Sequence, residues 1–215
     1  MKHQSLDILL TIGATIESID SVRYLSNWSS GKLGCCIASA AAMNGHNVTV
    51  LHGKQSLIPA AHPRINSIPY TSSEELSNIC DEQWESKDLL IMAAAVSDFI
   101  PKNKLKNAKI SRSSINQKIE LSPTDDIILK LAKRKRNNQT VIGFSLAEEK
   151  KLFDISRKKL KDKDIDAIIA NPLQTMNSKN INGILFTRSS TVLPPRESLS
   201  KSDFTKWLIS LLPEI

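Results

Sequence analysis

Stretches that are apolar throughout alternate with amphipathic stretches along this chain. Continuous apolar runs are typical of strands buried on both faces of a parallel sheet, and they stand at 8–12, 89–92, 141–142 and 165–170. An amphipathic stretch over 145–162 predicts a helix between the last two. Since parallel strands need crossover connections, the pattern predicts an α/β fold with a doubly wound, mainly parallel, Rossmann-like sheet.

Weaker signals predict further elements. Small residues from Lys32 onward predict a helix that ends before Gly45, and short apolar runs predict strands at 48–51 and 65–68. The run Ser72-Ser73-Glu74-Glu75 is typical of a capped helix start, and that helix is expected to reach Trp84. The pattern Ile127, Ile128, Leu131 predicts one more helix with a basic end.

A polar, lysine-rich stretch over about 102–121 interrupts this order. Residues 109–112 and 118–121 alternate in character around a polar centre, which predicts a β-hairpin that protrudes as a flap. It would emerge beside the carboxyl end of the sheet, where open α/β folds bind ligands. A plain surface insertion remains the alternative. We therefore expect residues 1–215 to form a single domain with this flap.

Composition narrows the class of protein. The chain has 215 residues, 40% of them hydrophobic, and a mean hydropathy of -0.20, which suits one well-filled core. No run approaches eighteen apolar residues and the first residues lack a signal-peptide pattern, so we expect a cytoplasmic protein with no membrane partner. Three cysteines make neither a disulfide framework nor a metal knuckle, and Cys35 and Cys36 are expected to be small core residues.

The net charge of +7 and pI of about 9.3 raise the question of nucleic acid. The sharpest basic run, 130–136, follows an apolar helical pattern, where cations suit the end of a helix. None of the ten aromatic residues (three Trp, two Tyr, five Phe) is interleaved with it, whereas single-strand binders need stacking platforms. We expect no nucleic-acid partner; a basic surface also suits small anionic substrates.

Candidate chemistry gathers after the first strand. Between Gly13 and Gly34, glycines and hydroxyls (Thr15, Ser29, Ser30) lead into a helix N-terminus, a favourable place for phosphate oxygens. Neither a Walker loop nor the three-glycine dinucleotide fingerprint can be written there, and a plain glycine turn remains open. The alanine run 93–95 leaves room for a flat ligand beside Asp98, and the expected turn 143–145 places the Phe144 ring where a base could stack. Close packing in the core would explain the alanines and the ring equally well.

Several motifs carry a resemblance to the phosphopantothenate-cysteine ligase family. The longest is Asp20-x-Val22-Arg23-Tyr24-x-Ser26-Asn27-x-Ser29-Ser30-Gly31-Lys32-x-Gly34. Six further elements resemble the family in the same order, and they lie at 93–99, 109–110, 124–127, 143–144, 157–166 and 170–171. The chain departs from the family pattern at Gly13-Ala14-Thr15, at Ser111-Arg112 in the flap, at Ala147 and at Met176 to Ile181.

The resemblance implies a ligase that couples L-cysteine to 4'-phosphopantothenate in coenzyme A synthesis. In that family a nucleotide, CTP or in some members ATP, activates the carboxylate with Mg²⁺ present. It implies that Asn27 and Lys109 are catalytic and that Arg23, Asn27 and Ala94 bind substrate. It further implies a nucleotide site made by Gly13, Ser29, Ser30, Ala95, Asp98, Lys109, Phe144 and Lys163, with Asp98 as the metal ligand.

The resemblance also implies a homodimer. The flavin-dependent decarboxylase that many bacterial members carry is missing from this chain, so we expect a stand-alone ligase, with the decarboxylase as a separate partner. The sequence leaves CTP against ATP open. Two alternatives from other classes are a nicotinamide-dependent oxidoreductase, which the missing glycine fingerprint disfavours, and a basic RNA-binding protein.

Overall fold

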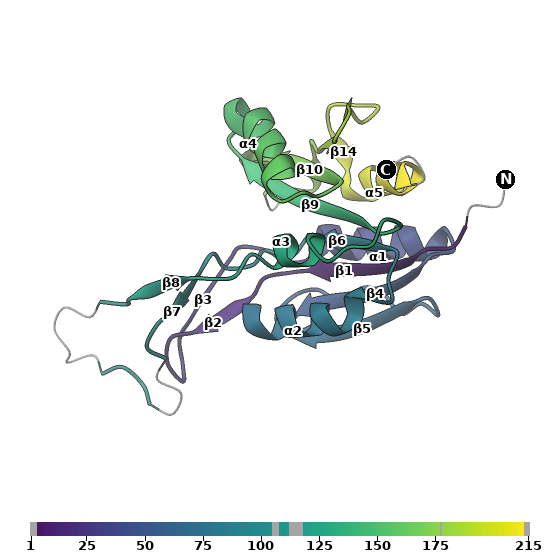
Figure 1. The fold of residues 1–215 in the computed structure, drawn as a ribbon. Helices are drawn as coiled ribbons and strands as arrows, with labels where there is room; N and C mark the ends of the chain where they lie inside the picture. The colour runs from purple at the N-terminus through teal and green to yellow at the C-terminus, as the bar shows by residue number, and fades with distance from the viewer. Residues whose placement is uncertain (1–3, 105–107, 112–117, 177, 213–215) are drawn as a thin grey trace.

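An eight-stranded sheet forms the centre of the protein (Figure 1). The computed structural model describes residues 4–104, 108–111, 118–176 and 178–212. The strands follow the order β13-β12-β10-β9-β6-β1-β4-β5. Their bounds are β1 (Asp7–Ile12), β4 (Asn47–Gly53), β5 (Ile65–Tyr70), β6 (Leu89–Met92), β9 (Thr140–Ala147), β10 (Ala167–Pro172), β12 (Ile184–Thr187) and β13 (Thr191–Val192).

The sheet is doubly wound, as the apolar runs predict. From β5 to β10 every neighbouring pair of strands is parallel. The remaining two pairs, β10 with β12 and β12 with β13, are antiparallel. The six parallel strands, numbered along the chain, follow the spatial order 3-2-1-4-5-6 of a Rossmann fold. The order of the strands therefore reverses between β1 and β6, which are the two central strands of these six.

Helices cover both faces of the sheet. Helices α1 (Lys32–Met43) and α5 (Lys201–Ser210) share one core with Ile8 and Leu10 of β1. On the other face, α2 (Ser73–Trp84), α3 (Ile127–Ala132) and α4 (Glu149–Asp162) enclose a second core that includes Leu9. Successive side chains from Ile8 to Leu10 thus enter opposite cores, which is why this strand is apolar at consecutive positions rather than alternate ones.

The predicted cap of α2 is confirmed. The Ser72 hydroxyl accepts a hydrogen bond from the Glu75 backbone N–H at 3.2 Å, and the Glu75 carboxylate accepts one from the Thr71 N–H at 2.7 Å. These bonds satisfy N–H groups that the first turn of a helix leaves without helical partners.

One predicted boundary is wrong. The helix expected from residue 145 begins at Glu149, and residues 143–145, expected to form a turn, lie inside β9. Strand β9 continues because it pairs with β10 as far as Ala147 opposite Pro172. Phe144 and Leu146 are two residues apart, which is the spacing of one face of a strand, and the pairing with β10 carries β9 through both positions.

Two short antiparallel pairs extend together from the carboxyl edge of the sheet (Figure 1). One pair is β2 (Ile16–Ser18) with β3 (Tyr24–Ser26), and the other is β7 (Phe99–Pro101) with β8 (Leu121–Pro123). We call these two pairs, with the β2–β3 turn and the described residues beyond β7, the arm. The flap is thereby seen at its base, but its paired strands are 99–101 and 121–123 rather than 109–112 and 118–121. Residues 105–107 and 112–117 lie outside the described chain.

The C-terminal part adds pieces that periodicity did not predict. They are a 3-10 turn η1 (Leu173–Thr175), the edge strands β12 and β13, and a small pair β11 (Asn180–Ile181) with β14 (Leu199–Ser200). Cys35 and Cys36 are half-buried rather than core residues, whereas Cys80 is buried. Cys35 and Cys36 belong to the N-terminal part of α1, and Cys35 packs against the core at its margin.

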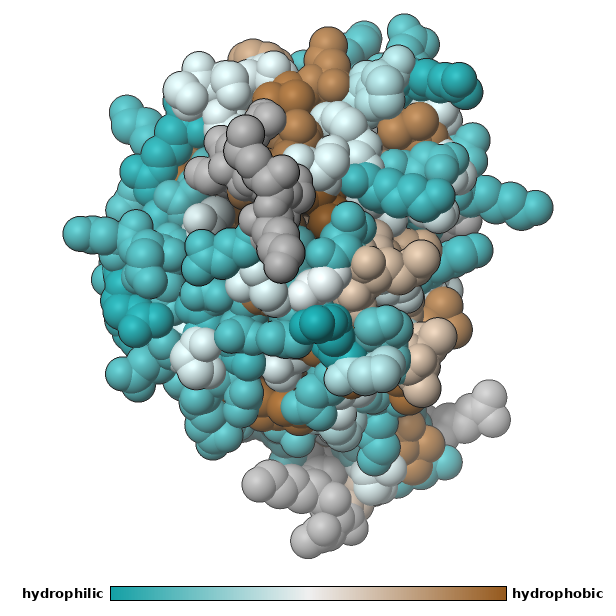
Figure 2. Space-filling view, turned by 90° about the vertical axis from the view of Figure 1, so that its right-hand side faces the viewer, coloured by the Kyte–Doolittle hydropathy of each residue, from teal (hydrophilic) through white to brown (hydrophobic). Residues whose placement is uncertain are grey.

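Hydrophilic residues dominate the side of the molecule that is turned away from the arm (Figure 2). Apolar residues appear there in small separate groups. Within the described ranges, none of the helices combines the length and the apolar character that crossing a membrane requires.

Candidate active site

The loops that leave β1 and β6 stay bonded to each other at the switch point of the sheet. Beyond the strands, the Ala95 N–H donates to the Gly13 carbonyl at 2.7 Å and the Thr15 N–H donates to the Ala95 carbonyl at 3.3 Å. The Thr15 hydroxyl also accepts the Ser97 N–H at 2.9 Å. These bonds fix two loops at the place where open α/β sheets bind their ligands.

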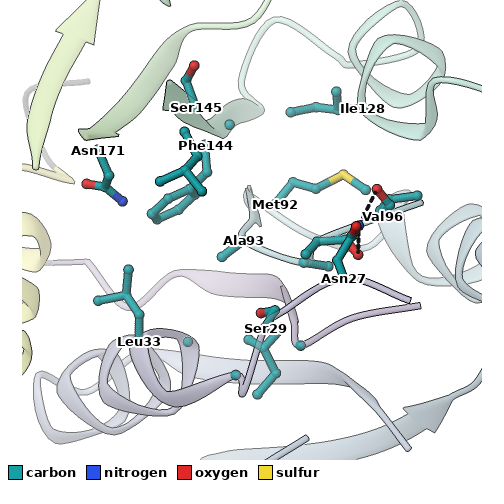
Figure 3. A pocket seen from close by; sticks show the side chains of 18 of the residues that line it. Asn27, Ser29, Leu33, Met92, Ala93, Val96, Ile128, Phe144, Ser145 and Asn171 are labelled. Carbon is teal, nitrogen blue, oxygen red and sulfur yellow. Dashed lines mark hydrogen bonds between the residues drawn. The ribbon is translucent and has the colours of Figure 1, made fainter. Parts of the chain in front are cut away.

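A cavity of about 700 Å³ opens at this edge (Figure 3). Its walls are the end of β1, the loop 93–98 after β6, residues 143–146 of β9, Asn171 of β10 and the start of α1. In Figure 3 Leu33 and Ser29 stand on the α1 side, the Phe144 ring faces the middle, and Ile128 stands on the α3 side. The volume lies in the range of sites for nucleotides and similar ligands.

Glycines let α1 approach β1 closely below the cavity. Gly13 has φ 82° and Gly31 has φ 75°, values that side-chain-bearing residues rarely adopt. A Cβ on Gly34 would stand 2.1 Å from Cγ2 of Ile12. The places of these three glycines, at the end of β1, directly before α1 and at the helix–strand contact, match those of the glycines in the dinucleotide fingerprint. The β2–β3 pair is inserted between the first and second, which is why the fingerprint cannot be written from the sequence.

The N-terminus of α1 forms a wall of the cavity that favours an anion. Ser29, Ser30 and Gly31 line the cavity directly before the helix, whose first N–H groups have no partner within the helix. Two ammonium groups, Lys32 and Lys201, line the same end. Burial, followed by the neighbouring charge of Lys32, lowers the pKa of Lys201 from its ordinary value. An anion placed here would relieve that repulsion.

Basic and acidic side chains lie side by side at the other end of the cavity. Lys163 Nζ lies 2.9 Å from an Asp126 carboxylate oxygen, and Lys159 is half-buried beside them. Burial, and then the charge of Lys163, lowers the pKa of Lys159, while Asp98 and Asp126 oppose that shift. Lys159 and Asp126 were not singled out from the sequence as site residues, although both fall inside motifs that carry the resemblance.

Asn27 joins the arm to the loop after β6. Its side-chain amide donates to the backbone carbonyls of Ala95 and Val96, both at 3.1 Å (Figure 3). Both amide hydrogens are thereby used, and the side-chain oxygen is left to accept a hydrogen bond. This geometry favours contact with an incoming N–H donor over donation to a carbonyl.

Two buried polar atoms stand beside the cavity. The Asn171 side-chain oxygen and the Ser145 hydroxyl have no hydrogen-bond partner among the described residues. Both residues line the cavity, although in Figure 3 the Ser145 hydroxyl points away from its middle. The sequence placed Ser145 in an expected turn and did not single out Asn171 as a site residue; a polar residue at the carboxyl end of an apolar run is the signal that was available.

Nine of the eleven predicted site residues line this one cavity. They are Gly13, Asn27, Ser29, Ser30, Ala94, Ala95, Asp98, Phe144 and Lys163. The other two, Arg23 and Lys109, lie on the arm and do not line it. The roles assigned to all eleven remain predictions.

The residues present fit a magnesium ion held largely by its ligand's phosphates. Among the described residues no group of three or more His, Cys, Asp or Glu side chains is placed to hold a metal by itself. Asp98, whose side chain is exposed, lines the cavity together with Asp125 and Asp126. Mg²⁺ is commonly bound by one or two carboxylates plus phosphate oxygens, so these carboxylates suffice beside a nucleotide.

The fold and the cavity define a Rossmann-like α/β protein that takes its ligands at the carboxyl edge of the sheet. Comparison with known proteins gives the particular family. The chain belongs to the family described as DNA/pantothenate metabolism flavoprotein C-terminal domain, whose model matches residues 3–214.

Individual relatives agree with this membership. The chain is 36% identical over 208 residues to the coenzyme A biosynthesis bifunctional protein CoaBC of Borreliella burgdorferi, covering 95% of this chain and 52% of that protein. It is 40% identical over 167 residues to a cysteine/cysteine sulfinic acid decarboxylase from an unknown prokaryotic organism, covering 78% of this chain and 46% of that protein. The crystal structure of the DNA/pantothenate metabolism flavoprotein from Streptococcus pneumoniae superposes with a TM-score of 0.86 at 26% identity, covering 98% of this chain and 99% of that one.

The resemblance found in the motifs is thereby confirmed at the level of the family. The chain spans about half the length of the curated relatives it matches.

Proposed function

We propose that this chain is a phosphopantothenate-cysteine ligase, which joins L-cysteine to (R)-4'-phosphopantothenate in coenzyme A biosynthesis. One observation carries the proposal: a single cavity at the switch point unites the α1 N-terminus, the lysines, Asn27 and the Phe144 ring. The kinship with CoaBC supports the pathway, since that protein's name places it in coenzyme A biosynthesis. The decarboxylase activity named for the other relative stays with that protein, of which this chain covers 46%.

The proposed reaction has two steps, with CTP as co-substrate. In the first, a substrate carboxylate oxygen bonds to the α-phosphorus of CTP while the bond from that phosphorus to pyrophosphate breaks. In the second, the cysteine amine bonds to the acyl carbon, the acyl–oxygen bond to CMP breaks, and the amine loses its proton. Negative charge gathers in both steps, so positioned donors and cations accelerate them.

Each end of the cavity suits one part of this chemistry. The N–H groups at the start of α1, with Ser29 and Ser30, bind phosphate oxygens, and Lys163 offers a cation toward the other end. A magnesium ion bound by Asp98 and the phosphates would screen their charge. The Asn27 side-chain oxygen accepts a hydrogen bond from the cysteine amine and orients it toward the acyl carbon. In this scheme Arg23 and Lys109 approach the substrates from the arm.

The choice of CTP over ATP is part of the proposal, as is a homodimer with a separate phosphopantothenoylcysteine decarboxylase as partner. The cytoplasmic location expected from the sequence also stays a prediction.

Contacts within the chain account for much of the basic run that raised the nucleic-acid alternative: Lys130 and Arg134 pair with Asp81, and Lys135 pairs with Asp166.

Pyrophosphate release tests the proposal directly. Purified protein is mixed with 4'-phosphopantothenate, cysteine, Mg²⁺ and either CTP or ATP, with omission of each substrate in turn as the control. We expect release that requires phosphopantothenate and is faster with CTP. No release with any nucleotide would refute the ligase, and faster release with ATP would refute only the choice of base.

A further inference from the structure

The β2–β3 turn of the arm contains a fully enclosed carboxylate. The side chain of Asp20 has no exposed surface. One of its oxygens accepts the backbone N–H groups of Val22 at 2.8 Å and Arg23 at 2.7 Å. The other accepts the Ile110 N–H at 3.1 Å and lies 3.2 Å from the Arg23 guanidinium. Asp20 therefore binds its own turn with one oxygen and a segment ninety residues away with the other.

The same turn holds the chain on the other side of Lys109. The backbone N–H and the hydroxyl of Ser21 both donate to the Ala108 carbonyl, at 3.2 Å and 3.1 Å. The Arg23 guanidinium donates to the Ile110 carbonyl at 3.3 Å. Both neighbours of Lys109 are thus bonded to the β2–β3 turn, while the side chain of Lys109 itself is exposed. We call these contacts the Asp20 clamp.

The clamp requires a charged carboxylate. Burial raises the pKa of Asp20, but the N–H donors of Val22, Ile110 and Arg23, with the Arg23 charge, outweigh burial and hold the pKa below its ordinary value. A carboxylate can accept hydrogen bonds at both oxygens, whereas a side-chain amide must present a donor on one side. An amide in this position would direct N–H toward either the turn or Ile110, and one set of bonds would be lost.

We propose that Asp20 is a positioning residue for Lys109. It fixes the backbone of that lysine to the β2–β3 turn by accepting the Ile110 N–H, while Ser21 of the same turn holds Ala108 and Arg23 adds a second bond to Ile110. The inference rests on the proposed function, in which Lys109 contacts the nucleotide. It adds that this lysine reaches the nucleotide from a bonded backbone position, set by a residue that touches no substrate.

A double-mutant cycle in the full chain separates this role from a general structural one. Asp20→Asn keeps the size of the side chain and removes its charge. We expect it to lower kcat/KM for the nucleotide by about 10- to 100-fold, the range that misplacement of a reacting group by about 1 Å reaches. In a Lys109→Ala background the same change should matter less than about 2-fold, because the group it positions is gone. Losses that multiply in the double variant would overturn the proposal.

Backbone exchange tests the clamp without any substrate. Hydrogen–deuterium exchange at 108–111 should accelerate at least about 10-fold in Asp20→Asn and less in Ser21→Ala, which removes one of the two bonds to Ala108. Asp166→Asn is the matched control: the Asp166 carboxylate accepts the Val141 N–H at 2.8 Å, away from the arm, so its loss should leave 108–111 unchanged. Unchanged exchange in Asp20→Asn would overturn the proposal.

The two measurements fail in different ways. A wild-type chain that releases no pyrophosphate refutes the proposed function, and exchange still decides whether Asp20 holds the Lys109 backbone. If Asp20→Asn does not fold, the milder Ser21→Ala carries both tests. It should then show faster exchange at 108–111 and a smaller loss of kcat/KM that disappears in the Lys109→Ala background.

Discussion

At the scale of single residues, Asn27 shows how geometry refines a predicted role. The sequence leaves open whether its amide holds an acyl carbonyl or an incoming amine. Both amide hydrogens are used by the backbone of Ala95 and Val96, so the oxygen is the group directed at a ligand. The side chain also ties the arm to the loop after β6, and its loss affects position as well as contact.

We expect Asn27→Ala to slow amide formation more than carboxylate activation. The change removes the acceptor for the cysteine amine, and misplacement of that amine costs about 10²-fold. Quenched-flow mass spectrometry with CTP should then detect acyl nucleotide that accumulates before product. Asn47→Ala, which removes an amide from the opposite edge of the sheet where it contacts Asp7, is the control. Equal loss of both half-reactions would contradict the assignment.

The thiols give a second prediction. Burial, then the nearby Asp81, raises the pKa of Cys80 to about 12, and burial with Cys36 raises that of Cys35 to about 11. At pH 8 both stay protonated, because a thiolate forms only as pH rises toward these values, and the thiolate is the nucleophile. Iodoacetamide labelling of native protein followed by mass spectrometry should leave Cys80 unmodified and Cys35 slow. Labelling of Cys80 as fast as in urea-unfolded protein would contradict this.

At the scale of elements, the contact between α1 and β1 positions the phosphate-binding end of the helix. Gly34 and Ile12 meet where a Cβ has no room. The sequence shows Gly34 only as part of a small-residue helix, since the space available to one atom depends on the strand packed against it.

We expect Gly34→Ala to destabilise the protein. Overpacking costs about 1–3 kcal/mol, and the change from Gly to Ala gains about 1 kcal/mol in helix propensity. The cost exceeds the gain because the clash with Ile12 is severe. A lower urea midpoint should reveal the change. Ile12→Ala removes the nearer clashing atom, Cγ2, and leaves only the Cβ at 2.6 Å, so the double variant should lose less than the two single losses combined. Additive losses would mean that α1 shifts to accommodate the methyl group.

Prediction of elements from the sequence succeeded where burial alone decides. Strands β1 and β6 are apolar at consecutive positions because helices cover both faces of the sheet. The cap of α2 depends on local side chains, Ser72 and Glu75, which the sequence shows directly. It failed for the second half of β9, which was assigned to a turn and a helix, because the extent of this strand is set by its pairing with β10. The short pair β11–β14 has too few residues for any period to register.

At the scale of the whole molecule, the arm exposes apolar side chains beside the cavity. Val22 is 63% exposed, Tyr24 45% and Trp28 82%. Apolar groups gathered beside a ligand site are typical of a contact surface. The homodimer that the family resemblance implies would cover them.

We expect these residues to lie in a homodimer interface. Light scattering at micromolar concentration should give twice the mass of the chain, and Trp28→Glu should shift the mass toward the monomer because a buried unpaired charge is costly. Met43→Glu, an exposed apolar residue at the end of α1, is the control and should leave the mass unchanged. A monomeric wild type would contradict the prediction.

The switch point described above has a consequence for how the chain reaches its working state. Strands β1, β4 and β5 come from the first 70 residues, whereas β6, β9 and β10 come from residues 89–172, and the seam between β1 and β6 joins positions about eighty residues apart. Loop closure of that length is costly, so contacts within each half are favoured to form before the seam closes. The cavity is built from both sides of the seam and cannot exist in either half alone. A ligand that fills it stabilises the union of the halves, so the appearance of binding during refolding reports the moment at which the chain becomes one domain.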